Sequence, residues 1–410
     1  MSSVIISNAH IFDGVGFLTE DADVVIRDGR VAAVDPGAGA LPEHADIAER
    51  VDAGGHTVLP GLVDLHVHSV IEGAGDLAHV SEPFSLHYYQ SVQYLERTLR
   101  CGITSIRDAG GAELGTKVAV DRGIIKGPRM RIAVTIMSQT GGHGDGMRHS
   151  GIEVPLLPTS PGRPRGIADG PEDCRRVARE IFRAGADHIK ICTSGGVLSP
   201  TDDPRHPQFT VAEIRAIVEE AQAHGTYVMA HAQGEGGIRN ALLGGVKTIE
   251  HGIYLDDATI QLMLDTGAWL VPTLIAPLWV VRASERPRSA LPANVVDKAK
   301  AVVDIHRAAV AHAFDAGVPI AMGTDTGVGP HGSNLEEIYL MTQIGMSLEQ
   351  ALRAATSDAG AFIGPGGYGA LNVGSVGDAV LLDRRLTDAS HLVDLDRKIA
   401  AVYKDGVSQF

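Results

Sequence analysis

Two histidines, His66 and His68, stand two residues apart in an otherwise apolar stretch that reads LPGLVDLHVH over residues 59–68. Apolar residues and histidines alternate there at the period of a β-strand, which places both imidazoles on the same face. Neutral imidazole is a common ligand for zinc and similar ions. The pair alone is a weak signal, because a strand with two polar residues on its solvent face has the same pattern.

More polar residues fall at or near the ends of later strand-like segments. Lys190 lies between two isoleucines, and His231, His251 and Asp325 each end or directly follow a short apolar run. A single histidine at a strand end is usually a hydrogen-bonded core residue, but chance does not readily place so many at successive strand ends. On the axis of a closed barrel of parallel strands they would converge. Four histidines and one aspartate could then enclose one metal ion, or hold two with open positions.

Lys190 is the unusual member of this set, because its isoleucine neighbours point outward if it points inward. Burial of an ammonium group is costly, so we expect the pKa of Lys190 to fall well below its ordinary value. A neutral amine there could form a Schiff base with a carbonyl substrate, or add carbon dioxide to become a carbamate that bridges two cations. The surrounding histidines favour the carbamate. The structural alternative is an ion pair with an inward acid.

The middle of the chain alternates strand and helix, as a parallel α/β fold requires. Expected helices cover residues 88–101, 172–184, 211–224 and 295–316, and Thr210 and Glu213 have the spacing of a capping box. The expected strands are residues 62–68, 104–106, 131–136, 188–192, 227–230, 248–250, 269–273 and 320–322. Eight such units favour a (β/α)8 TIM barrel. An open doubly wound sheet would normally carry a glycine-rich phosphate turn after its first strand, where this sequence has none.

Four long connections, residues 68–86, 138–170, 194–208 and 274–292, all follow a strand and precede a helix. In a barrel they would gather on the face where active sites are built. Both ends of the chain instead read as short strands, at residues 4–9, 24–27, 30–34, 379–382 and 399–403. We therefore expect residues 1–58 and 366–410 to form one small β-sandwich domain beside a barrel of residues 59–365.

Composition bounds the function classes. The chain has 410 residues, 44% hydrophobic and 21% charged, with a formal net charge of −15. Such acidity argues against sequence-independent binding to nucleic acid and against an anionic membrane surface. We expect no signal peptide and no apolar run long enough to span a bilayer. The scattered cysteines, Cys101, Cys174 and Cys192, indicate reduced, mostly buried thiols in a cytoplasmic protein.

Taken in order along the chain, these motifs resemble the amidohydrolase superfamily. The resemblance rests on LPGLVDLHVH, Lys190, His231, His251 and the segment GTDT at 323–326, with NAHIFDG at 8–14 and GSVGDAV at 374–380 similar to its sandwich strands. It implies a binuclear centre, usually zinc. His66, His68 and Asp325 would hold the first ion, His231 and His251 the second, and carboxylated Lys190 (N6-carboxylysine) would bridge them. Such a pair lowers the pKa of a shared water towards 7, and Asp325 would carry its proton to the leaving amine.

Within that superfamily the chain looks similar to Xaa-Pro dipeptidases (prolidases) and N-acyl amino-acid hydrolases. The supporting segments are GGHGD at 141–145, SGG at 194–196 and HGIY at 251–254. The resemblance implies that His143 and Tyr254 help to hold the carboxylate or carbonyl of the substrate. One arginine of the long loop after strand three, among Arg148, Arg163 and Arg165, could clamp that carboxylate. We expect His188 to be a core histidine.

The sequence thus predicts a metal-dependent amidohydrolase that releases the C-terminal residue of a dipeptide or N-acyl amino acid, and we expect a homo-oligomer. Three alternatives stay open. A mononuclear deaminase or imidazolonepropionase-like hydrolase of cyclic amides would bind one ion per chain. A Schiff-base lyase acting through Lys190 would be trapped by borohydride with a carbonyl substrate. A non-enzymatic scaffold would be expected to lack some of the ligands that are present here.

Overall fold

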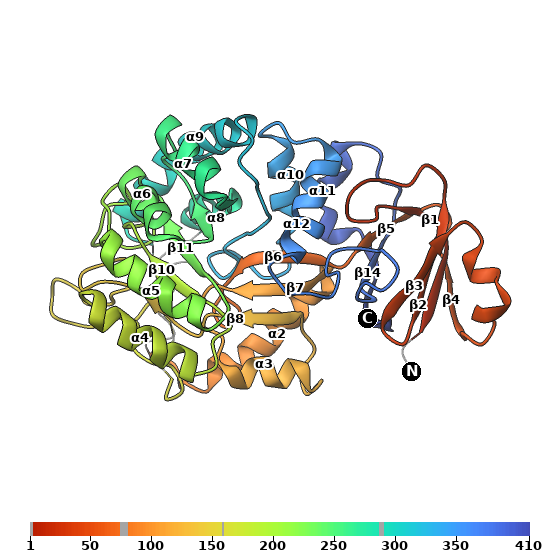
Figure 1. The fold of residues 1–410 in the computed structure, drawn as a ribbon, viewed down its shortest axis with the longest axis horizontal. Helices are drawn as coiled ribbons and strands as arrows, with labels where there is room; N and C mark the ends of the chain where they lie inside the picture. The colour runs from red at the N-terminus through yellow and green to blue at the C-terminus, as the bar shows by residue number, and fades with distance from the viewer. Residues whose placement is uncertain (1–2, 74–80, 158–159, 287–290) are drawn as a thin grey trace.

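The computed structural model describes residues 3–73, 81–157, 160–286 and 291–410, which form an α/β protein with two parallel sheets and a third, mixed sheet (Figure 1). The mixed sheet contains strands from both ends of the chain, in the order β16-β15-β14-β5-β1-β2-β3, with β4 also paired to β1. Its strands are β1 (Val4–Ile11), β2 (Ala22–Arg27), β3 (Arg30–Asp35), β4 (Glu49–Asp52), β5 (Thr57–Pro60), β14 (Ala379–Leu382), β15 (Ile399–Lys404) and β16 (Val407–Ser408). The described residues at both ends of the chain lie at this sheet, β1 at one end and β16 at the other.

The two parallel sheets occupy the middle of the chain. One has the order β6-β7-β8, with β6 (Leu62–Val67), β7 (Ile103–Asp108) and β8 (Arg129–Ile132). The other runs from β9 (Ile136–Met137) through β10 (Ile189–Cys192), β11 (Val228–Ala232) and β12 (Thr248–His251) to β13 (Trp269–Val271). Within each of these two sheets, every strand pairs with the next strand along the chain. A doubly wound sheet, by contrast, reverses its strand order part of the way across.

Helices connect these strands. They are α2 (Leu86–Arg100), α3 (Leu114–Asp121), α4 (Pro171–Arg183), α5 (Val211–Ala223), α6 (Glu235–Gly244), α7 (Asp257–Thr266), α8 (Ile275–Ser284), α9 (Ala293–Asp315), α10 (Glu336–Thr342), α11 (Leu348–Ala354) and α12 (Ser357–Gly360), with 3₁₀ turns at Ala38–Ala40, Pro42–His44, Ala389–Leu392 and Leu395–Arg397. The predicted capping box is confirmed, since the Thr210 hydroxyl accepts from the Glu213 backbone and the Glu213 carboxylate accepts from Thr210. The connection expected over 274–292 instead contains helix α8.

Two expected strands differ in the structure. The third, over residues 131–136, is divided into β8 and β9 because Val134 adopts a left-handed conformation (φ 65°). Residues 320–322, which are fully described, make one isolated parallel bridge in place of the eighth strand, from Ile320 to Leu270. The ladder stops there because the Met322 N–H donates to the carbonyl of Ala354, the last residue of α11, instead of to a strand.

Burial follows the expected pattern. Cys101, Cys174 and Cys192 are free and buried, and His188 is fully buried, as predicted. Over the described ranges, no helix has both the length and the apolar character that crossing a membrane requires.

A buried charge pair joins the parallel strands to the mixed sheet. Arg129 of β8 binds Asp378, which precedes β14 and is only 5% exposed, and also contacts Asp405. Because Asp378→Ala leaves a largely buried guanidinium without its main partner, we expect it to lower the free energy of unfolding by about 3 kcal/mol. Urea denaturation measures this. The matched control is Asp21→Ala, which removes a surface ion pair with Arg385 and should cost less than about 1 kcal/mol; equal costs for both variants would contradict the prediction.

Candidate functional site

The six predicted metal ligands come together in the structure. His66 lies on β6 and His68 directly after it, Lys190 on β10, His231 on β11 and His251 at the end of β12. Asp325 follows the bridged segment at residues 320–322. All six side chains are buried and line one cavity of about 350 Å³. The structure therefore brings together the side chains that the sequence predicted would converge.

One half of the cluster is the triad of His66, His68 and Asp325. Their candidate ligand atoms all lie within 4.8 Å of one another. Asp325 Oδ1 is 3.5 Å from His66 Nε2 and 3.3 Å from His68 Nε2. Such a spacing suits a single divalent ion held by two imidazoles and one carboxylate.

The other half lies against this triad. Lys190 Nζ is 3.1 Å from His66 Nε2, so the lysine points inward as its position predicted. The ring of His251 is centred 5.1 Å from that of His66 and 4.7 Å from that of His231. Lys190 therefore lies beside the triad, and His251 lies between His66 and His231.

Hydrogen bonds fix which nitrogen each histidine turns to the centre. His66 Nδ1 bonds Glu250 (2.7 Å), His68 Nδ1 bonds the carbonyl of Gly110 (2.8 Å) and His251 Nδ1 bonds the Thr273 hydroxyl (2.7 Å). The remaining nitrogen of each ring is Nε2, and such outer partners orient metal-binding histidines. In His231 the roles are exchanged, because its Nε2 contacts the Gly195 carbonyl at 3.1 Å and Nδ1 remains.

Burial disfavours the charged forms of Lys190 and of three of the histidines, whereas at His68 the hydrogen bond and charge of Asp325 outweigh burial and raise the pKa. Burial lowers the pKa of Lys190, an effect that the opposing charge of Glu250 only partly offsets. It also lowers the pKa of His66 and His231 well below the usual range and that of His251 to about 3. Neutral imidazole is the form that binds metal ions and a deprotonated amine is the form that adds carbon dioxide, so the lowered pKa values favour both reactions.

Two site residues depend on unusual backbone. His251 and Asp325 adopt left-handed conformations, with φ of 75° and 61°. Asp64 lies two residues before His66 on the same strand. It accepts hydrogen bonds from the hydroxyl and the backbone N–H of Thr324 and so anchors the residue next to Asp325. Burial raises the pKa of Asp64 to about 6, despite these hydrogen bonds.

Sequence reasoning missed the acid behind His66. Glu250 is fully buried and bonds both His66 and Arg107, whose guanidinium is also fully buried. The available signal was its position directly before His251, on a strand expected to lie in the barrel wall, where an unpaired carboxylate would be costly.

The predicted substrate contacts have different outcomes. His143 lines the cavity and stacks on His231, with ring centres 4.3 Å apart. Tyr254 is half-buried and is not among the described residues that line the cavity, so its role stays a prediction. Arg148 lines the cavity, whereas Arg163 donates to the backbone carbonyls of Val134 and Gly111 and supports the loop.

The cavity walls are mainly apolar away from the cluster. Arg165, the third arginine proposed to bind a carboxylate, is not among the described residues that line the cavity and forms an exposed ion pair with Glu153. The apolar lining comes from the loops after β6 and β9 and from α8: Val70, Ile71, Pro83, Phe84, Val154, Pro155, Leu156, Leu157, Ala276, Pro277 and Val280. Ligand pockets of this kind bind an apolar group and orient it with a few polar contacts.

A centre of histidines, a lysine and an aspartate, carried on or near parallel strands, is typical of a metal-dependent α/β hydrolase. Comparison with known proteins agrees. The Amidohydrolase family matches residues 57–408. Ochratoxinase from Aspergillus niger is 33% identical over 365 residues, which cover 85% of this chain and 75% of that protein.

Solved structures are also similar over nearly the whole chain. A prolidase complexed with N-methylphosphonate-L-proline has a TM-score of 0.90 and 33% identity, with 99% of each chain covered. A Xaa-Pro dipeptidase with bound methionine has a TM-score of 0.87 and 29% identity, with both chains fully covered. The chain therefore belongs to the amidohydrolase family. It is a hydrolase that acts on amide bonds, and its family is metal-dependent.

Proposed function

We propose that the enzyme hydrolyses the amide bond of an N-acyl amino acid or dipeptide and releases the C-terminal residue, with two divalent metal ions, of which zinc is the leading candidate. The observation that carries the proposal is the buried cluster of four histidines, Lys190 and Asp325, which lines one cavity together with many apolar side chains. The similarity to a prolidase complexed with N-methylphosphonate-L-proline and to a Xaa-Pro dipeptidase with bound methionine supports the choice of an amide with a free carboxylate beside it, because both ligands are amino acids or their derivatives.

The residues present fit a metal pair. His66, His68 and Asp325 would hold one ion, His231 and His251 the other, and a carbamate on Lys190 would bridge them. Three of the four histidines have Nδ1 occupied by a hydrogen-bond partner and Nε2 available, as the donor set of a metal site requires. When bound, such ions make a water molecule a nucleophile at neutral pH and polarise the scissile carbonyl.

The chain's own groups handle binding and proton transfer. Asp325 Oδ1 lies at the cavity surface between His66 and His68, where it would accept the proton of the attacking water and deliver it to the leaving nitrogen. His143 would bind the substrate's carbonyl or carboxylate oxygen, and Arg148, the arginine among the described residues that line the cavity, would pair with a carboxylate. The apolar walls would take the substrate's side chain or acyl group and exclude water from it.

We further propose that the parallel sheets are two parts of one closed (β/α)8 barrel spanning residues 59–365. Support comes from parallel bridges that link Leu270 to Ile320 and Val67 to Thr326, which connect the outer strands β13 and β6 through one segment. Glu250 of one sheet also bonds His66 of the other across a shared interior. The β-sandwich domain proposed for residues 1–58 and 366–410 has an apolar cluster of its own, which includes Ile6, Ile11 and Tyr403.

Metal analysis by mass spectrometry and a substrate screen test the proposed function. We expect two ions per chain, hydrolysis of N-acyl amino acids or of dipeptides ending in Pro, Arg or an aromatic residue, and complete loss of that activity after chelation. Zinc added back should restore the activity, because the ligands remain folded around the site. One ion per chain would favour the mononuclear deaminase or cyclic-amide hydrolase. Activity that survives chelation would contradict a metal-dependent mechanism.

A further inference from the structure

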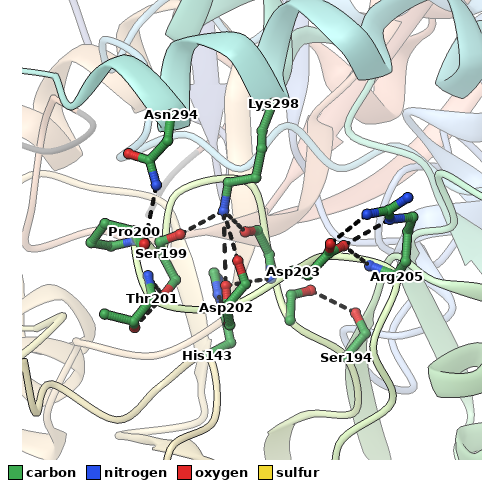
Figure 2. Close-up of polar contacts among 12 residues, drawn as sticks. His143, Ser194, Ser199, Pro200, Thr201, Asp202, Asp203, Arg205, Asn294 and Lys298 are labelled. Atoms are coloured by element: carbon green, nitrogen blue, oxygen red, sulfur yellow. Dashed lines mark hydrogen bonds and ion pairs between the residues drawn. The ribbon is translucent and has the colours of Figure 1, made fainter. Parts of the chain in front are cut away.

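His143 is held by the loop between β10 and α5 and by β11, both of which lie far from it in the sequence. Its Nδ1 is 3.2 Å from Asp202 Oδ2 (Figure 2), and its backbone N–H donates to the Gln208 side chain at 2.9 Å. Its ring lies nearly parallel to that of His231, at an angle of 16°. A side chain in a glycine-rich loop is thus restrained at its edge, on its face and at its backbone.

Gly196 is part of this restraint. A Cβ atom at Gly196 would lie 2.1 Å from Cε1 of His143 and 2.5 Å from Nδ1. Since no real contact is so short, glycine is required because the ring packs directly on the backbone there. The second glycine of the SGG segment at 194–196 therefore leaves the space that the His143 ring occupies.

Lys298 of α9 fixes the loop that carries Asp202. Its ammonium group donates to the carbonyls of Gly196 (2.8 Å), Ser199 (2.6 Å) and Asp202 (3.2 Å), and lies 3.9 Å from the Asp202 carboxylate (Figure 2). Burial alone would raise the pKa of Asp202, but the hydrogen bond and charge of His143 outweigh it and lower the pKa. Asp202 is therefore an ionised carboxylate, which can only accept hydrogen bonds.

We propose that Gly196, Asp202 and Lys298 are positioning residues for His143, which commit its Nδ1 hydrogen to Asp202 and leave Nε2 as the nitrogen that contacts the substrate. The inference rests on the proposed function, in which His143 binds a substrate oxygen. Lys298 holds the loop, Asp202 sets the tautomer and Gly196 provides the space for the ring. Outer residues of this kind typically change activity by about 10–100-fold.

Kinetics of the metal-loaded enzyme test the positioning role. We expect Asp202→Asn to lower kcat/KM by about 10–100-fold in the parent and to cause no further loss in a His143→Ala background, because it acts through His143. Metal content should stay at the parent's level. The control is Asp203→Asn, because Asp203 bonds Arg205 instead (Figure 2) and its loss should leave kcat/KM unchanged.

Lys298→Met provides a second route, with Lys300→Met on the exposed face of α9 as its control. We expect the Lys298 variant to lose activity only where His143 is present. An Asp202→Asn enzyme as active as the parent, or losses of equal size with and without His143, would overturn the inference.

A spectroscopic measurement keeps this test separate from the proposed function, because it needs no substrate. In ¹⁵N-histidine NMR of the metal-loaded protein, assigned with His143→Ala, we expect the His143 Nδ1 to carry a hydrogen, and Asp202→Asn to shift that signal strongly. A parent spectrum with the hydrogen on Nε2 alone would overturn the inference even in an active enzyme. The expected spectrum supports it even if no N-acyl amino acid is hydrolysed, in which case only the proposed function fails.

Discussion

Asp325→Asn is expected to abolish turnover while the fold survives. Asparagine cannot accept the proton of the attacking water, and general acid–base transfer contributes about 10²–10⁴-fold to rate. Because the substitution also weakens a candidate metal ligand, we expect kcat to fall by more than about 10⁴-fold. Steady-state kinetics with the enzyme's best substrate measure the loss.

The backbone makes asparagine the appropriate replacement. Asp325 has φ of 61°, a left-handed conformation that asparagine and aspartate tolerate better than other residues with side chains. The melting temperature should therefore stay close to the parent's. Asp28→Asn is the matched control, because Asp28 is exposed, has φ of 51° and lies in a turn near the start of the chain, far from Asp325 in the sequence. Normal activity in Asp325→Asn would show that another group carries the proton.

Lys190→Ala is expected to remove the metal pair. The amine lies 3.1 Å from His66 Nε2 and is buried, so burial lowers its pKa and favours the neutral form that reacts with carbon dioxide. Without a bridging anion two cations repel each other across the site. We expect metal affinity to fall by more than the roughly 10–100-fold that outer-shell partners contribute, and activity to be lost with it. Mass spectrometry of the dialysed variant measures the bound ions.

A matched variant distinguishes the loss of the bridging carbamate from the loss of side-chain volume at residue 190. Lys190→Ala leaves room for a small carboxylate such as acetate or propionate, which would partly restore the metal ions and the activity. Lys190→Met removes the amine but occupies that room, so it should not respond. Two tightly bound ions in either variant without added carboxylate would overturn the bridge, and borohydride trapping of parent Lys190 with a carbonyl substrate would favour a lyase.

The positions of the candidate ligands could be predicted from the sequence, because strand periodicity depends only on residues that are close together in the chain. The spacing of His66 and His68 defines one face of a strand, and Lys190 between two isoleucines defines an inward position. The structure places both where these patterns predicted. Alternation of strand and helix likewise predicted the parallel sheets and their sequential order.

Other features have no local signal. Strand alternation would put Glu250 and His251 on opposite faces, yet both reach the interior because His251 has φ of 75°. The left-handed turn at Val134 divides a strand that reads as continuous. Such conformations cost energy in isolation and persist only where surrounding contacts over-determine them.

The sequence by itself determined the residue types of the centre, the strands that carry them and the family they resemble, since all three depend on short motifs in a fixed order. Only the tertiary structure decided which partner orients each histidine. Glu250 bonds His66, which lies 184 positions earlier in the chain. Lys298 donates hydrogen bonds to the loop of Asp202 from a helix about 100 residues later. Contacts between segments so far apart form when the chain packs, and no periodicity within either segment encodes them.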